Sequence, residues 1–82
     1  MEKKKILIVE DNPIVAEDIK TAVQSMGYHV TATAYSGKDA LKSAERQPPD
    51  IALMDIRLGK GLNGIETAGE LRGKYQISVI YL

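Results

Sequence analysis

Short apolar runs recur along the chain and predict four β-strands. Residues 6–9 (Ile-Leu-Ile-Val) and 51–54 (Ile-Ala-Leu-Met) are continuously apolar, and residues 77–82 form a third, nearly continuous run. Residues 28–34 are rich in valine and threonine and predict a weaker strand. Continuous rather than alternating runs of this length are typical of strands buried on both faces, as in a parallel sheet.

The segment after the first run predicts a helix with recognisable ends. Asn12 can cap it, and Pro13 at the first helical position gives up no hydrogen bond that the helix needs. Gly27 is suited to the left-handed conformation that ends many helices. We expect the inward face to consist of apolar residues at helical spacing: Val15, Ile19, Ala22, Val23 and Met26.

Two further helices are predicted between the remaining strands. Ser36 and Asp39 form a capping box, and two prolines at 48–49 stop the helix that follows. A loop with three glycines then leads to a third helix, capped by Asn63 and Glu66. The expected inward positions are Ala40, Leu41 and Ala44 in the second helix, and Ile65, Ala68 and Leu71 in the third.

The order of the predicted elements is β-α-β-α-β-α-β within one domain of 82 residues. Alternation at this spacing favours right-handed crossovers and a parallel sheet with helices on both faces. The sequence therefore predicts an α/β fold in which ligands bind beyond the carboxyl ends of the strands.

Composition and charge narrow the possible functions. Eleven basic and eleven acidic residues balance, so the chain alone has no electrostatic reason to bind nucleic acid. The absence of cysteine excludes disulfides and thiolate metal sites. No apolar stretch approaches the roughly 20 residues of a membrane span, and we expect a cytoplasmic protein.

Acidic residues follow two of the predicted strands. Glu10 and Asp11 come directly after the first strand, and Asp55 comes directly after the third. If these strands are neighbours, three carboxylates share one small site, and their mutual repulsion favours a bound divalent cation. Mg²⁺ fits hard oxygen ligands best, and an aspartate can act as a nucleophile toward phosphorus. Alternatively, these acids are only turn, cap or helix-dipole residues.

Four segments of the chain resemble CheY-like receiver domains, which have a flavodoxin-like fold. Residues 6–13 (Ile-Leu-Ile-Val-Glu-Asp-Asn-Pro) resemble the start of such domains. Residues 49–58 and 63–66 resemble the phosphorylation strand and the loop after it, and residues 79–82 resemble the start of the fourth strand. The resemblance implies a regulatory module, not an enzyme, that takes phosphate from a histidine kinase.

The resemblance also implies a role for each residue of the site. Asp55 is the expected phosphoacceptor, and Asp11 the direct Mg²⁺ ligand. Glu10 is expected to support the metal, through water, and the backbone carbonyl of Arg57 to supply a further ligand. Because position 57 is arginine, the second acid that a metal-dependent phosphatase would need is missing there.

The sequence departs from the receiver pattern in two ways. The loop after Asp55 has Gly59 where proline is usual, and it is about one residue longer. The expected domain, residues 1–82, is a partial receiver truncated after the fourth strand. It lacks the fifth strand, the last two helices, and the Ser/Thr and Lys that would bind the phosphoryl group. We therefore expect weak Mg²⁺ binding and impaired phosphorylation.

The predicted fourth strand would lie at the edge of the sheet, where unpaired backbone groups favour pairing with another chain. We expect a homo-oligomer through this strand, with a C2 dimer as its form. The alternative to a signalling module is an α/β unit whose main property is self-association and which has lost its signalling activity.

Overall fold

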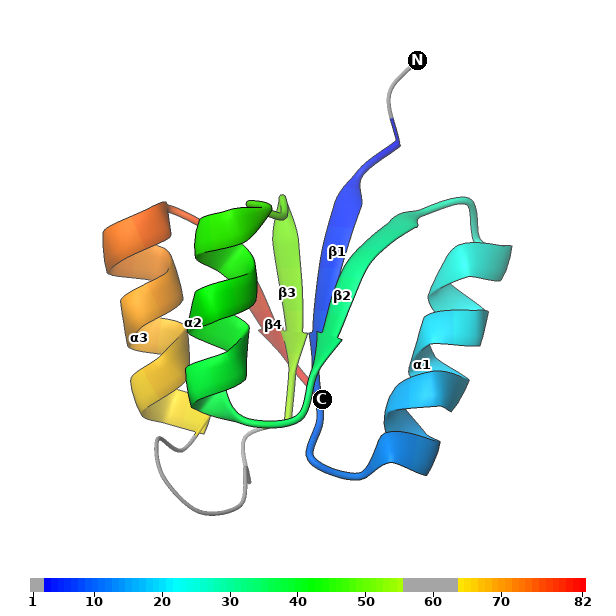
Figure 1. Cartoon of the computed structure of the whole chain (residues 1–82). Helices are drawn as coiled ribbons and strands as arrows, with labels where there is room; N and C mark the ends of the chain where they lie inside the picture. The colour runs from blue at the N-terminus through cyan, green and yellow to red at the C-terminus, as the bar shows by residue number, and fades with distance from the viewer. Residues whose placement is uncertain (1–2, 56–63) are drawn as a thin grey trace.

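The computed structural model describes residues 3–55 and 64–82, which form a parallel sheet with helices on both faces (Figure 1). The strands lie in the order β2-β1-β3-β4, so β1 and β3 are neighbours. The strands are β1 (Lys5–Val9), β2 (His29–Ala34), β3 (Ile51–Met54) and β4 (Ser78–Tyr81). The helices are α1 (Pro13–Ser25), α2 (Gly37–Arg46) and α3 (Gly64–Tyr75). The predicted fold class is confirmed.

Side chains of alternate strand residues point to opposite faces of the sheet and build two apolar layers. On one face α1 packs through Ala16 and Val23 against Ile6 and Ile8 of β1. On the other face α2 and α3 lie side by side (Figure 1). They cover a larger cluster that contains Leu7, Val9, Ala34, Ala40, Ala44, Ala52, Met54, Ala68, Leu71 and Ile77. The continuous apolar runs reflect this burial on both faces.

The predicted helix ends of α1 are confirmed. The Asn12 side-chain oxygen accepts hydrogen bonds from the backbone N–H of Ile14 at 2.9 Å and of Val15 at 3.4 Å. Gly27, just beyond α1, has a φ of 94°. In α2 the Ser36 hydroxyl accepts the backbone N–H of Asp39 at 3.1 Å, as the capping box predicts.

The predicted inward face of α1 is partly wrong. Val15 and Met26 are exposed by 41% and 66% of their surface, and Ala22 is also exposed. Ala16 is buried in place of Val15. Because Val15 and Ala16 are both apolar, helical spacing allows either of them to face the sheet. The structure places the smaller Ala16 there.

The predicted inward face of α3 is also partly wrong. Ile65 was expected to point inward but is 62% exposed, whereas Thr67 is fully buried. Ala68 and Leu71 are buried as predicted, and Leu41 of α2 is half-buried against the same core. Asn63, the predicted cap of α3, lies outside the described residues.

Two hydrogen bonds between Lys5 and Asp50 join β1 and β3 at their amino ends. The Asp50 carboxylate accepts the backbone N–H of Lys5 at 2.8 Å, and the Asp50 N–H donates to the Lys5 carbonyl, also at 2.8 Å. Beyond this pair the two strands run in register from Ile6 opposite Ile51 to Val9 opposite Met54.

Candidate metal and phosphoacceptor site

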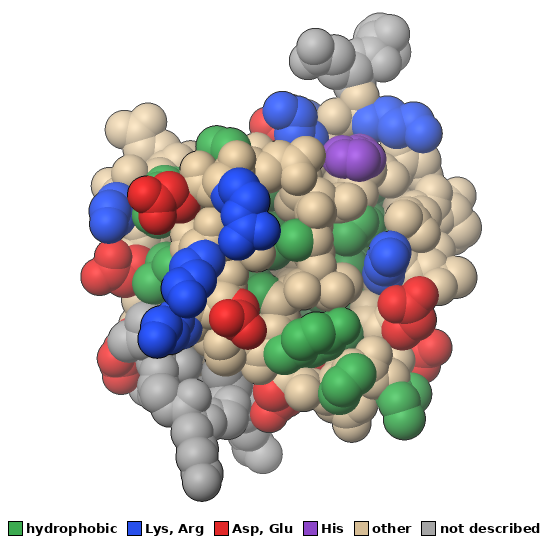
Figure 2. Space-filling view, viewed as in Figure 1, with side chains coloured by type: hydrophobic (Ala, Val, Ile, Leu, Met, Phe, Trp, Pro, Cys, Tyr) green, Lys and Arg blue, Asp and Glu red, His purple; other side chains and the backbone are tan. Residues whose placement is uncertain are grey.

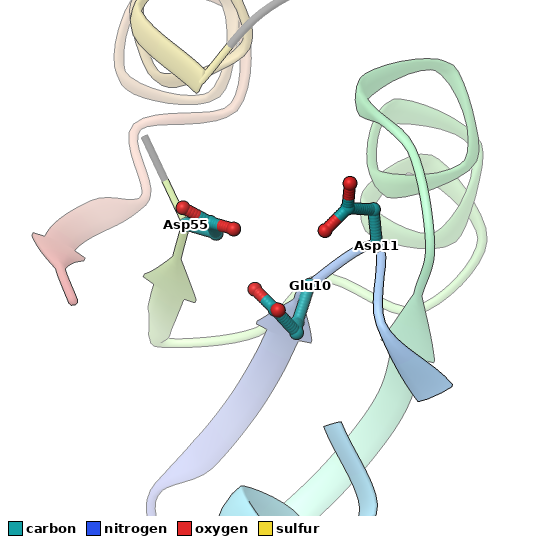
Figure 3. Close-up of side chains that lie close together, drawn as sticks. All are labelled: Glu10, Asp11 and Asp55. Atoms are coloured by element: carbon teal, nitrogen blue, oxygen red, sulfur yellow. The ribbon is translucent and has the colours of Figure 1, made fainter. Parts of the chain in front are cut away.

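Three carboxylates meet where β1 and β3 end. Because Val9 lies opposite Met54 in a parallel pair, the residues that follow the two strands leave the sheet side by side. The Asp55 N–H donates to the Val9 carbonyl at 2.9 Å, which continues the ladder into the site. The side chains of Glu10, Asp11 and Asp55 point toward one another (Figure 3).

One carboxylate oxygen from each of the three residues lies within 4.8 Å of the others. The three residues differ in exposure: Glu10 is buried, Asp55 is half-buried and Asp11 is exposed. The predicted proximity of these residues is confirmed. The site thus has a closed floor and an open mouth, through which a ligand can reach Asp55.

The burial and the negative charges of the site change the pKa of Glu10. Burial, a hydrogen bond with the Asp55 side chain and the negative charges of Asp55 and Asp11 raise the pKa of Glu10 from 4.5 to about 7. The backbone N–H of Asn12 donates to Glu10 and opposes this rise. The Glu10 carboxyl therefore keeps its proton to a higher pH than an exposed glutamate does, and the protonated carboxyl can donate a hydrogen bond to Asp55.

The donor set fits Mg²⁺. Carboxylate oxygens are the hard ligands that this ion takes, at about 2.0–2.1 Å, so two ligands on opposite sides of it are about 4 Å apart. The spread of 4.8 Å between the oxygens is close to that limit, and a small side-chain rotation or a bridging water closes the difference. A cation there would also lower the pKa of Glu10, because it stabilises the ionised carboxylate.

Two features of the site go beyond the sequence prediction. The Glu10 side chain contacts Asp55 directly, a contact that the sequence does not predict. The Asn12 N–H also enters the site, although Asn12 was recognised only as a helix cap. Arg57, whose carbonyl was expected to bind the metal, lies outside the described residues. The roles of all four predicted site residues stay predictions.

No helix in the described ranges is long and apolar enough to cross a membrane. The described residues also contain no second cluster of three acids or histidines like the one formed by Glu10, Asp11 and Asp55.

The chain is similar to several known proteins. It is 33% identical over 79 residues to the phyllosphere-induced regulator PhyR of Methylorubrum extorquens, a match that covers 95% of this chain and 30% of PhyR. A PhyR from Bartonella quintana, solved in complex with the anti-sigma factor NepR, is 30% identical with a TM-score of 0.88. That match covers 96% of this chain and 33% of the solved chain.

A second solved structure is similar at the level of a single domain. The signal receiver domain of a modulated diguanylate cyclase from Desulfovibrio desulfuricans G20 is 35% identical, with a TM-score of 0.92. The match covers 96% of this chain and 63% of that domain. The chain thus spans about a third of the PhyR proteins and under two thirds of this receiver. Residues 6–82 match the response regulator receiver domain, and the chain belongs to that family.

Proposed function

We propose that this receiver domain accepts a phosphoryl group on Asp55 from the phosphohistidine of a histidine kinase. The supporting observation is the cluster of three carboxylates within 4.8 Å at the carboxyl ends of β1 and β3. In this proposal Asp11, Asp55 and the Arg57 carbonyl bind Mg²⁺, and Glu10 supports the ion from beneath.

The chain's own residues position the nucleophile. The backbone hydrogen bond from Asp55 to Val9 holds the acceptor at the end of β3, and its half-buried side chain stays accessible from the mouth. One Asp55 carboxylate oxygen forms a bond to phosphorus while the P–N bond of the phosphohistidine breaks. The electron pair of that bond remains on the imidazole nitrogen. The bound Mg²⁺ would offset the negative charge of the phosphoryl group.

Charge and composition argue against nucleic acid as the partner of this chain alone. Lysine and arginine side chains lie among aspartates and glutamates on the face that carries α2 (Figure 2). This mixture, with a net charge of zero, gives nucleic acid no extended basic surface there. Because the chain spans about a third of PhyR, we do not propose NepR as its partner. We propose that the chain acts in the cytoplasm, together with the part of the histidine kinase that carries the phosphohistidine.

Labelling by a small phosphodonor tests this proposal. Incubation with phosphoramidate and Mg²⁺, followed by intact-mass spectrometry, should give weak labelling that EDTA and Asp55→Asn abolish. Asp18→Asn is the matched control, because it removes an exposed carboxylate of α1 and should label like the wild type. Equal labelling of Asp55→Asn, or labelling that is insensitive to EDTA, would contradict the proposal.

A second candidate function is an α/β unit whose main property is self-association and whose acids no longer act. The exposure of Ile80, Tyr81 and Leu82, at and just beyond the edge strand β4, favours it. A titration with Mg²⁺ and then beryllofluoride, followed by NMR, separates the two. A response that Asp55→Asn abolishes supports the phosphoacceptor, and no response at millimolar Mg²⁺ supports the association unit.

A further inference from the structure

The strand β2 forms one edge of the sheet, and the described residues place no strand on its outer side. It pairs with β1 in parallel, but the pairing is irregular. Ile6 lies opposite Val30, and the next residue of β1, Leu7, lies opposite Ala32. Thr31, between Val30 and Ala32, therefore has no partner in β1. One extra residue in one of two paired strands is a β-bulge, which bends the strand and interrupts the ladder.

Two backbone hydrogen bonds show the same irregularity independently. The His29 N–H donates to the Lys4 carbonyl at 3.0 Å, and the Ala34 carbonyl accepts the Glu10 N–H at 2.9 Å. Both His29 and Ala34 thus turn backbone groups toward β1, although they are five positions apart. In a regular strand, residues that face the same neighbour are separated by an even number of positions. The alternation therefore shifts by one residue within β2.

The Thr31 side chain fixes the bulge to β1. Its hydroxyl donates to the Ile6 carbonyl at 3.3 Å, in a partly buried position. The Ile6 carbonyl points toward β2, because the carbonyl of Lys4, two residues earlier, accepts a hydrogen bond from β2. The extra residue is thus bonded to a ladder carbonyl of the neighbouring strand.

The bulge changes the backbone groups that β2 presents at the open edge. Because His29 and Ala34 face β1, the adjacent residues Val30 and Thr33 face the edge. These two are three positions apart, whereas a regular strand offers hydrogen-bonding groups at every second residue. A regular strand added there can pair with the backbone of Val30 or of Thr33, but not with both.

We infer that the bulge at Thr31 closes this edge of the sheet, so that a strand of another chain does not extend the sheet at β2. The rest of the strand favours such pairing, because valine and threonine are strong β-formers. Residues 30–34 contain neither a charged side chain nor a proline, which protect the edges of other sheets. The bulge is the protection that these five residues carry. The inference does not rest on the proposed function.

Deletion of Thr31 tests the inference. Val30 and Ala32 already lie opposite consecutive residues of β1, so the deletion keeps the other pairs and makes the strand regular. The variant should fold, as judged by circular dichroism. In analytical ultracentrifugation between about 20 µM and about 1 mM it should associate more than the wild type. Thr31→Val is the matched control, because it keeps the extra residue and loses only the hydroxyl. It should sediment like the wild type.

Hydrogen exchange measured by NMR locates the association. In the wild type the amides of Val30 and Thr33 should exchange at rates that do not depend on protein concentration. In the deletion variant both amides should exchange more slowly at the higher concentration, because an added strand covers them. Thr33→Pro, combined with the deletion, removes an N–H at the edge without cutting the ladder to β1. It should restore the sedimentation of the wild type.

A folded deletion variant that associates no more than the wild type would overturn the inference. Association that Thr33→Pro does not reverse would also overturn it. If the deletion variant does not fold, the exchange rates of the wild type decide. Slower exchange of Val30 and Thr33 at the higher concentration would show an edge that is open despite the bulge, and constant rates support a closed edge.

Discussion

The raised pKa of Glu10 predicts that the acidic site destabilises the metal-free protein as the pH rises. In the unfolded chain Glu10 ionises with a pKa of about 4.5, and in the folded protein with a pKa of about 7. Below pH 4.5 the carboxyl is protonated in both states and has no effect. Between pH 4.5 and 7 the unfolded state releases the proton first, so the free energy of unfolding falls.

The two pKa values set an upper limit on this effect. At about 1.4 kcal/mol for each pKa unit, the difference between 4.5 and about 7 corresponds to at most about 3.5 kcal/mol of unfolding free energy, and solvent screening at the open mouth of the site reduces it to about 1–3 kcal/mol. The total free energy of unfolding of a protein is usually about 5–15 kcal/mol, so a loss of this size should be easy to measure. Mg²⁺ should reverse it, because the cation replaces the proton and binds more tightly as Glu10 ionises.

Urea denaturation followed by circular dichroism, from pH 4.5 to 8 with EDTA and at one protein concentration, measures the effect. Glu10→Gln keeps the shape of the side chain but cannot ionise. Its stability relative to the wild type should rise from near zero at pH 4.5 to about 1–3 kcal/mol at pH 8. Glu17→Gln, at an exposed position of α1, should stay within about 0.5 kcal/mol of the wild type throughout. A constant difference between Glu10→Gln and the wild type would refute the reasoning.

Three predictions concern stability and can be measured from urea midpoints. Gly69→Ala and Gly73→Ala should each stabilise α3 by about 0.5–1 kcal/mol, because both are helical and nothing lies within 4 Å of the added Cβ. Gly27→Ala is the opposing control and should destabilise by about 1 kcal/mol, because its φ is 94°. Gln76→Gly should stabilise by about 0.5–1 kcal/mol, since Gln76 has a φ of 56°, and no gain would mean that this backbone is unstrained. Leu71→Ala should cost about 2–5 kcal/mol, because Leu71 is fully buried, and a smaller loss would show that the core collapses into the space.

The sequence predicted the arrangement of elements because the relevant signals are local. Asn12, Pro13 and Gly27 determine where α1 begins and ends through their own backbone chemistry. Three of the four strand segments are short runs that are continuously or almost continuously apolar, and the helical segments between the strands favour parallel crossovers. The meeting of Glu10 with Asp55 followed from that topology alone, since it needs only that β1 and β3 be neighbours.

Two features could not be predicted from local signals: which residues of each helix face the sheet, and how deeply the acidic residues of the site are buried. Val15 and Ala16 both fit the spacing of α1, and only contact with the sheet decides which one is buried. Ile65 and Thr67 pose the same choice in α3. The burial of Glu10 against Asp55 depends on side-chain positions in three dimensions, and no sequence signal distinguishes it from an exposed acid after a strand.

The contacts between Asp50 and Lys5 have a consequence at the far end of their strands. Asp50 and Asp55 are five residues apart on one extended segment, a span of about 16 Å. A slip of one residue between β1 and β3 would carry Asp55 about 3.3 Å along the strand and turn its side chain to the other face. The geometry of the acidic site is therefore anchored on the opposite side of the molecule, and a substitution at Asp50 could disable the site without touching it.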